Sequence, residues 1–260
     1  MEFDTEGKWL NTYQLNSDPT RILPLEDELF VFNCRNLPEY ISPIDQSLII
    51  SDLNNNIQKV YKNYHKRNSR PALVNPFSAF YTYQGNIIFR EYGCDTLFKV
   101  KKDDLMPYYI LSLGNKEIPP DFPIIDGRKF VEIGCRDEYP GKYYLQLIFE
   151  NTDNLYVNLD NFNDADRMYG FINKHSHTVK IIGKDGFQND IDGGLPFFPK
   201  FVYNDSILVD YVNAFDLRAH VLNGNASEMR RLYGQKYDDL VKLVNSIDDE
   251  SNPIVVMIKK

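Results

Sequence analysis

The chain has 260 residues, 43% of them hydrophobic, which is long enough and apolar enough to bury a sizeable core. Its formal net charge of -8 excludes a nucleic-acid backbone or an anionic membrane surface as the main partner, because both attract clustered Lys and Arg. No stretch approaches the roughly 18 apolar residues that span a bilayer, so no transmembrane segment is expected. Asp4, Glu6 and Lys8 lie where a signal peptide needs an apolar stretch, so no signal peptide is expected in the chain.

Short apolar runs separated by polar turns follow one another along most of the chain, which is typical of β-hairpins. Residues 1–15 form the first predicted hairpin, with TEGK as its turn. Four later hairpins resemble one another, each with a turn rich in Asp, Asn, Glu or Gly: residues 22–33, 80–91, 147–159 and 201–212. Hairpins of a second kind, in which the second strand is more polar, follow the first three: residues 47–64, 96–111 and 168–182.

Two successive hairpins make a four-stranded antiparallel meander, and here the meander repeats. Equivalent positions, Leu23, Phe80, Ile148 and Phe201, are separated by 57, 68 and 53 residues. This repeat predicts an all-β fold, a β-propeller of about four to five four-stranded blades that forms a single domain over residues 1–260. Within a blade, the first hairpin is expected to supply apolar inner strands and the second hairpin wetter outer strands. Residues 1–15 are expected to be a half-blade, because propellers commonly close their ring with strands from both chain ends.

The C-terminal part of the chain has a different pattern. Apolar residues recur at helical spacing within residues 226–248, and Ser227 is expected to be the N-cap of one long helix there. Residues 252–260 predict a closing strand, with Pro253 at its start, where a missing N–H is tolerated.

Several segments together resemble a known group of proteins. They are NDIDGGLPFFPKFV, CDTLFKV after the GNIIFREY hairpin, YILSLGNKEIP, and the helix that closes on SNPIVVMIKK. The chain resembles the bacterial six-bladed β-propeller family of unknown function, many of whose members are exported lipoproteins, and the resemblance is good over residues 75–260. It implies a location in the periplasm or at the cell surface.

Members of that family are longer, with a lipoprotein leader and six blades. We favour the interpretation that a leader and the first blades are absent from this chain, and the alternative is a shorter propeller. An incomplete ring leaves strand edges and apolar blade faces exposed, which implies a homodimer or poor solubility.

Asp190 and Asp192 are the first candidate ligand-binding residues. Their spacing is similar to that in calcium loops, which take several oxygens from one short segment. The favoured interpretation is structural, because Gly193 and Gly194 follow at once and no further acid occurs before Asp205. In this interpretation the Asp side chains cap backbone N–H groups at a corner that leads into the next strand. Calcium is the alternative, and no other cofactor or metal is predicted.

A second set of candidates comes from the fold alone. Six-bladed lactonases and related hydrolases place Glu, Asn and Asp around a metal at the propeller axis, and the first-type hairpins offer Asn33, Arg90, Glu91, Asn158, Asp160 and Asp210. Of these, Arg90, Glu91 and Asp210 join the two loop aspartates as predicted ligand-binding residues.

The remaining side chains give weaker signals. His175 and His177 fit an exposed hairpin turn better than a metal pair, and nothing beyond residue type supports His220 as a base. Cys34, Cys94 and Cys135 are too far apart for a zinc motif. Six aromatic residues could stack on sugar rings, although core packing is favoured: Tyr81, Tyr83, Tyr143, Tyr144, Phe197 and Phe198.

The sequence contains neither a GxSxG nucleophile motif nor a phosphate-binding loop. The leading hypothesis is therefore a non-catalytic binding or interaction propeller with a protein or glycan ligand. The alternative is a lactonase-like, metal-dependent hydrolase or lyase acting at the propeller axis, and a third hypothesis is a purely structural fragment.

Overall fold

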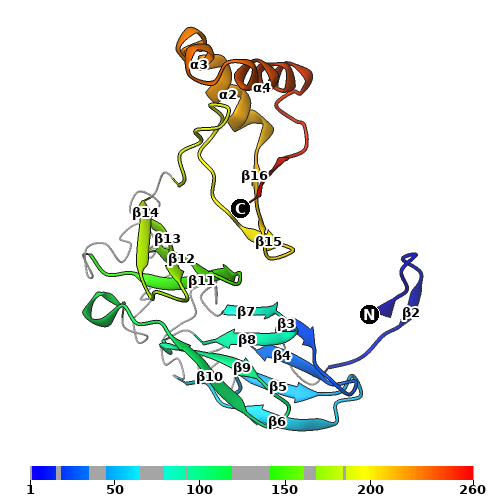
Figure 1. The fold of residues 1–260 in the computed structure, drawn as a ribbon. Helices are drawn as coiled ribbons and strands as arrows, with labels where there is room; N and C mark the ends of the chain where they lie inside the picture. Colours follow the sequence, from blue (N-terminus) through cyan, green and yellow to red (C-terminus); the bar gives the residue numbers. More distant parts are fainter. Residues whose placement is uncertain are drawn as a thin grey trace, which may run out of the picture. The chain divides into compact units, whose positions relative to one another are not determined.

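The computed structural model describes residues 2–15, 19–34, 45–64, 79–91, 93–118, 141–160, 168–183 and 186–259. These residues are mostly in antiparallel β-sheets, with a helical region near the C-terminus (Figure 1). The chain divides into two units, the first comprising residues 1–147 and 160–163 and the second comprising residues 148–159 and 164–260. None of the helices in the described ranges has both the length and the apolar character needed to cross a bilayer.

The first unit begins with an exposed hairpin and continues with two four-stranded sheets. The hairpin pairs β1 (Glu2–Phe3) with β2 (Trp9–Asn11). The first sheet has the order β3 (Pro19–Pro24), β4 (Phe30–Cys34), β5 (Leu48–Ser51) and β6 (Ile57–Tyr61). The second sheet contains β7 (Ala79–Tyr83), β8 (Asn86–Arg90), β9 (Thr96–Val100) and β10 (Leu105–Ile110), also in chain order, and the short 3-10 helix η1 (Gly114–Lys116) follows it.

The two sheets of the first unit pack on each other through a shared hydrophobic core. Buried side chains come from β4 and β5 on one side and from β7, β8 and β9 on the other: Val31, Leu48, Ile50, Phe80, Ile87, Phe89 and Val100, with Leu29 from the β3–β4 turn. A further link joins the first strands of the two sheets, because Nη1 of Arg21 in β3 donates to the carbonyl oxygen of Phe80 in β7 at 3.2 Å. Consecutive sheets therefore lie side by side within this unit.

The second unit holds the third four-stranded sheet and a three-stranded sheet. The third sheet has the order β11 (Tyr144–Glu150), β12 (Asn154–Asp160), β13 (Met168–Asn173) and β14 (Val179–Gly183), and the unit boundary falls within β11. The last sheet has the order β15 (Phe201–Tyr203), β16 (Ile207–Val212) and β17 (Ile254–Lys259). All the predicted hairpins are thus present, and the prediction of four-stranded antiparallel meanders is confirmed.

The burial of the strands differs from the expectation in one respect. The fourth strands of the four-stranded sheets, β6, β10 and β14, are the most exposed strands of their sheets, as expected for solvent-facing outer strands. However, β3 is largely exposed although it belongs to a first-type hairpin, and β5 is buried although it belongs to the second type. Strands in the middle of a sheet have a neighbour on each side, so their position in the sheet determines burial more than the type of hairpin does.

The prediction of one long helix over residues 226–248 is wrong. Three helices precede β17: α2 (Ala214–Asn223), α3 (Ala226–Tyr233) and α4 (Gln235–Ser246). Gly234 separates α3 from α4 with φ 56° and ψ -131°, a backbone conformation that essentially only glycine adopts. The cap of α3 is also not Ser227 but Asn225, whose side chain accepts from the Glu228 N–H at 3.3 Å.

Candidate functional site

The ends of the second strands in the first-type hairpins bury polar side chains, which is where the sequence placed its axial candidates. All of these candidates are less than 9% exposed: Asn33, Arg90, Glu91, Asn158, Asp160 and Asp210. Burial of so many polar groups requires hydrogen-bond partners, because an unpaired buried polar group is costly. The partners that these groups have indicate what they do.

Arg90 is the last residue of β8 in the first unit and Glu91 follows it. Other groups of the protein bind both side chains. The Arg90 side chain is 2% exposed, and its Nη1 donates to the carbonyl oxygen of Leu145 at 2.9 Å. Its Nη2 lies 3.4 Å from Oε1 of Glu117. Burial lowers the pKa of Arg90, and the nearby Glu117 carboxylate partly offsets this. Glu91 accepts from the backbone N–H of Tyr64 at 2.9 Å, so both residues tie loops to the end of the strand.

Asp210, in β16 of the second unit, is also occupied by neighbouring groups. Its Oδ2 accepts from the N–H of Phe198 at 2.8 Å, and its Oδ1 accepts from the N–H of Tyr211 at 2.7 Å and from Nζ of Lys200 at 2.5 Å. The carboxylate therefore fixes the segment that leads into β15. A ligand would have to displace these donors to reach it.

Across the described ranges, no three His, Cys, Asp or Glu side chains gather into a group that could hold a metal ion. Asn33 accepts from the Thr20 hydroxyl at 2.8 Å across the β3–β4 pair. The arrangement of these residues supports a packing role for them.

The loop NDIDGG, residues 189–194, carries Asp190 and Asp192 and forms a corner that lies against helix α3. Oδ1 of Asp192 accepts from the Gly194 N–H at 2.9 Å and from Nδ2 of Asn189 at 2.8 Å. Gly193 has φ +77°, and a Cβ there would lie 2.9 Å from the Tyr233 ring of α3. Asp190, in contrast, is exposed. The corner thus uses Asp192 to cap backbone groups.

The histidines occupy structural positions. His175 and His177 lie in the exposed β13–β14 turn, where Nε2 of His175 is 3.3 Å from Oδ1 of Asp153 and His177 adopts φ 57°. Nε2 of His220 lies 3.1 Å from the carbonyl oxygen of Gly193, which links α2 to the corner. Among the cysteines, Cys34 and Cys94 are buried, and Cys135 lies outside the described residues.

The aromatic residues singled out from the sequence pack against the protein rather than forming an open platform. Tyr144 and Phe197 are buried. Phe198 lies 4.6 Å from the Tyr169 ring, centroid to centroid, and Phe197 lies 6.5 Å from the ring of Phe187. Tyr81, Tyr83 and Tyr143 are partly buried.

A different set of side chains forms an exposed surface that sequence reasoning missed. Residues directly opposite each other on antiparallel strands share one face of the sheet. The register pairs Phe201 with Val209, Tyr203 with Ile207, Tyr211 with Val255 and Val209 with Met257. One face of the β15–β16–β17 sheet therefore carries the five residues that we call the apolar face: Phe201, Tyr203, Tyr211, Val255 and Met257.

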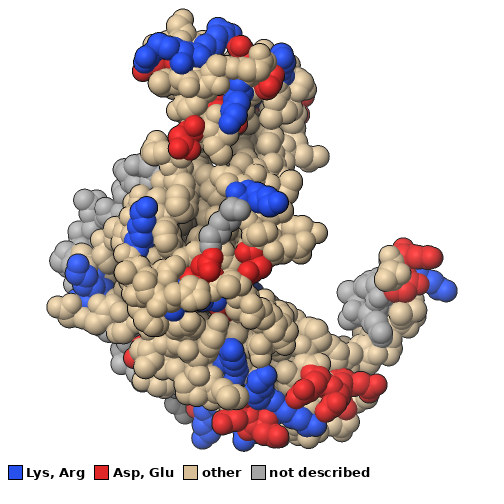
Figure 2. Space-filling model, in the orientation of Figure 1, with Lys and Arg blue, Asp and Glu red and all other residues tan. Residues whose placement is uncertain are grey.

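The apolar face is unusually open for side chains of this size. Its members are exposed by 49% for Phe201, 56% for Tyr203, 51% for Tyr211, 59% for Val255 and 66% for Met257. At their centre Val209 is only 3% exposed, because the larger side chains surround it. In contrast, Lys and Arg intermingle with Asp and Glu over helices α2–α4 of the same unit (Figure 2). The sequence signal was present in IVVMIK, where apolar residues occupy both faces of a strand.

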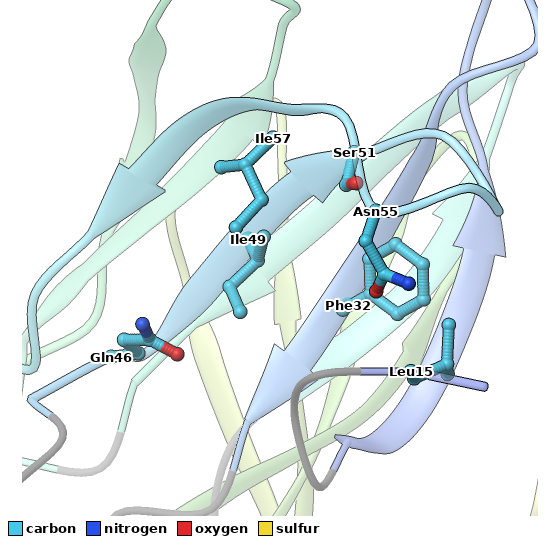
Figure 3. Close-up of a pocket in the computed structure, with 7 residues that line it drawn as sticks. All are labelled: Leu15, Phe32, Gln46, Ile49, Ser51, Asn55 and Ile57. Carbon is cyan, nitrogen blue, oxygen red and sulfur yellow. The ribbon is translucent and has the colours of Figure 1, made fainter.

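A small cavity in the first unit is a weaker candidate. It lies on the face of strands β4, β5 and β6, beside Leu15 of the segment that follows β2. Figure 3 shows the residues that line it: Leu15, Phe32, Gln46, Ile49, Ser51, Asn55 and Ile57. Its volume is about 40 Å³. Small-molecule sites usually measure about 300 Å³ or more, so this cavity can take no more than the tip of one side chain.

Comparisons with known proteins agree with the β-rich architecture. A sequence model of the family described as "Domain of unknown function (DUF4934)" matches residues 1–259. A similar solved structure is the crystal structure of a "Putative exported protein" from Bacteroides fragilis NCTC 9343, with a TM-score of 0.70 and 15% identity, covering 98% of this chain and 69% of that chain. At this identity the likeness concerns the fold alone. No curated protein matches the chain. The chain belongs to the DUF4934 family, whose function is unknown.

Proposed function

We propose that this member of the DUF4934 family is a non-catalytic binding module that recognises another protein through its apolar face. The observation that supports this proposal most strongly is the exposure of five large apolar side chains on one side of the β15–β16–β17 sheet. Contiguous exposed apolar patches on soluble proteins commonly mark interaction sites. Aromatic residues and Met are also the residue types that are enriched in the cores of protein interfaces.

The shape of the surface favours a protein over a small molecule. Small-molecule sites are concave and enclose most of their ligand, whereas the apolar face is one side of a three-stranded sheet. Its polar neighbour is the Lys200 ammonium, which lies 3.8 Å from the centroid of the Tyr211 ring and orients that ring. An apolar surface with a charged rim is the usual composition of a protein interface.

We further propose that the successive sheets are blades of one β-propeller domain over residues 1–260. Three observations support this: the three four-stranded meanders follow one another in the chain, Arg21 joins the first strands of the first two sheets, and equivalent hairpin tips meet in the second unit. There, Oδ1 of Asp205 in the β15–β16 turn accepts from the N–H of Thr152 in the β11–β12 turn at 2.8 Å. Contacts between equivalent strands and tips are expected when blades stack on one another.

The proposed location is outside the cytoplasm, in the periplasm or at the cell surface. The support is the structural likeness to a Bacteroides protein that is described as exported, together with the family resemblance of the sequence. A binding module in that location would meet proteins of the cell envelope or its surroundings.

Site-specific photo-crosslinking tests the binding function. A photoreactive phenylalanine analogue replaces Tyr203 on the apolar face, and the same analogue replaces Val179, an equally exposed residue of β14, as the matched control. In cells that produce the protein naturally, the variant at residue 203 is expected to give one discrete protein adduct that the variant at residue 179 does not give. If both positions give the same adducts, or position 203 gives none, the apolar face is not a recognition surface.

A further inference from the structure

The outer edge of β17 has no partner strand among the residues that the structure describes. Within the described residues, β17 pairs with β16 alone, whereas the β3–β6, β7–β10 and β11–β14 sheets each have four strands. The carbonyl oxygen of Val209 accepts from the Lys200 N–H at 2.8 Å, so the backbone groups of Val209 point towards β15. Because direction alternates along a strand, those of Leu208 and Asp210 point towards β17.

This alternation determines which groups of β17 are free. Leu208 lies opposite Ile258 and Asp210 opposite Val256, so these β17 residues direct their N–H and C=O groups to β16. The intervening residues Val255, Met257 and Lys259 direct theirs to the open edge. The same three residues also place their side chains on the side of the sheet that carries the apolar face.

We propose that the occupant of this edge is β17 of a second copy of the chain, paired antiparallel about a two-fold axis. This inference goes beyond the proposed function, because edge pairing engages β17 and leaves the apolar face open to a further partner. Edge pairing would join the two three-stranded sheets into one, and the apolar faces of the two copies would become continuous. An exposed edge strand with apolar side chains is a template for such pairing, and a two-fold interface places the same surface patch on both copies.

Charge complementarity favours a second copy as the partner. In antiparallel pairing, residues whose backbone groups point outward must lie opposite one another in the two copies. Residues 255, 257 and 259 are such residues, so the two-fold axis passes through Val255, Val256 or Met257. With the axis on Val255 or Val256, Lys259 lies opposite residue 251 or 253 of the other copy, close to the acidic run Asp248, Asp249 and Glu250 that precedes its β17. Asp249 is already paired with Arg218, at 2.8 Å from Oδ1 to Nε, so the exposed Glu250 is the acid that Lys259 would meet.

Antiparallel pairing also keeps like charges apart. Lys259 is the one charged residue of β17, and it lies at the end of the strand. The two-fold axis places the two copies of Lys259 at opposite ends of the joined edge. Residues 254–258 are all apolar, so the middle of the interface contains no charge that would have to be desolvated.

Sedimentation of the purified chain of residues 1–260 over a range of concentrations tests the proposal, with a dimer expected. Met257→Pro removes an outward N–H but no bond to β16, and it is expected to weaken dimerisation by more than about tenfold. Lys259→Glu changes only an exposed side chain and is expected to weaken it by about fivefold. The double variant Lys259→Glu with Glu250→Lys should restore the affinity, whereas Lys236→Glu, which makes the same change of charge on α4, should leave it unaltered.

The outcomes separate this inference from the proposed function. A chain that stays monomeric at all concentrations overturns the homodimer, and so does a dimer that neither Met257→Pro nor Lys259→Glu weakens. If such a monomer still gives a discrete adduct with a different protein through position 203, the binding function stands and only the homodimer fails. If position 203 crosslinks nothing and the chain is monomeric, both proposals fail.

Discussion

Nζ of Lys200 lies 2.5 Å from Oδ1 of Asp210, and this ion pair joins the residue before β15 to β16. The Asp210 side chain is 1% exposed and the Lys200 side chain 40%, so the carboxylate is buried while the ammonium still reaches water. The same ammonium donates to the carbonyl oxygen of Tyr211 at 2.9 Å. The pair therefore fixes the segment before β15 to β16, and the Lys200 ammonium also packs on the Tyr211 ring of the apolar face.

Replacing Asp210 should destabilise the protein markedly. Asp210→Ala leaves the N–H groups of Phe198 and Tyr211 and the Lys200 ammonium without their acceptor, which predicts a loss of about 3 kcal/mol in the free energy of unfolding. Asp210→Asn keeps one carbonyl oxygen and should cost about half as much. Urea denaturation measures both, with the exposed turn residue Asp103→Ala as a control that should change stability by less than about 0.5 kcal/mol. Equal losses for Asp210→Ala and Asp103→Ala would refute the role of Asp210.

The corner at residues 189–194 should depend on Asp192 and not on calcium. Asp192→Ala removes the acceptor of the Gly194 N–H and is expected to cost about 1 kcal/mol, whereas the exposed Asp190→Ala should be near neutral. Thermal unfolding followed with added calcium and then with a chelator should give the same midpoint for the unmodified protein. A midpoint that rises with calcium, and that loses this rise in Asp190→Ala and Asp192→Ala, would establish a calcium loop instead.

Gly234 should be essential for the break between α3 and α4. A Cβ at this position would meet no atom within 4 Å, so any cost of Gly234→Ala comes from the backbone conformation alone. That conformation predicts a loss of about 1 to 3 kcal/mol in the free energy of unfolding. Urea denaturation followed by circular dichroism provides the measurement, with Lys236→Ala on the exposed surface of α4 as the control. An unchanged stability would mean that alanine can join the two helices without disturbing the hydrophobic contacts between them.

Tyr156 should make stability fall at alkaline pH. Burial raises the pKa of Tyr156, and a hydrogen bond with Asn154 offsets this only in part. Because the folded-state pKa is above the unfolded value of about 10, the neutral phenol contributes stability that is complete below about pH 10 and is lost as pH rises through the folded-state pKa. Tyr156→Phe removes this contribution. The stability of the unmodified protein should therefore fall more steeply above about pH 10 than that of Tyr156→Phe, and parallel curves from urea denaturation would contradict the assignment.

Much of the β architecture followed from local patterns. The alternation of apolar runs with Asp- and Asn-rich turns located each hairpin, because strand period and turn chemistry are local properties of a few neighbouring residues. The strand at the C-terminus was visible in NPIVVMIKK for the same reason. In the helical region, however, periodicity continued through Gly234, so the pattern concealed the break that the backbone makes there.

The candidate site was much harder to predict. The sequence identified Arg90, Glu91 and Asp210 as polar residues at the ends of apolar strands, and all three are buried. Whether such a residue binds a ligand or holds a loop depends on the groups that its side chain contacts. Those groups belong to Leu145, Tyr64 and Phe198, which come from other segments of the chain. No local pattern specifies contacts of this kind.

The sequence by itself determined the hairpins, their grouping into four-stranded meanders and the acidic character of the chain. The tertiary structure decided which apolar side chains are buried and which remain exposed. Val209 and Met257 are both apolar residues in strands and lie opposite each other, yet one is 3% and the other 66% exposed. The physical reason is that burial is a property of the neighbours: Val209 is surrounded on both sides within its sheet, whereas Met257 lies on a strand whose outer edge has no partner in the described residues.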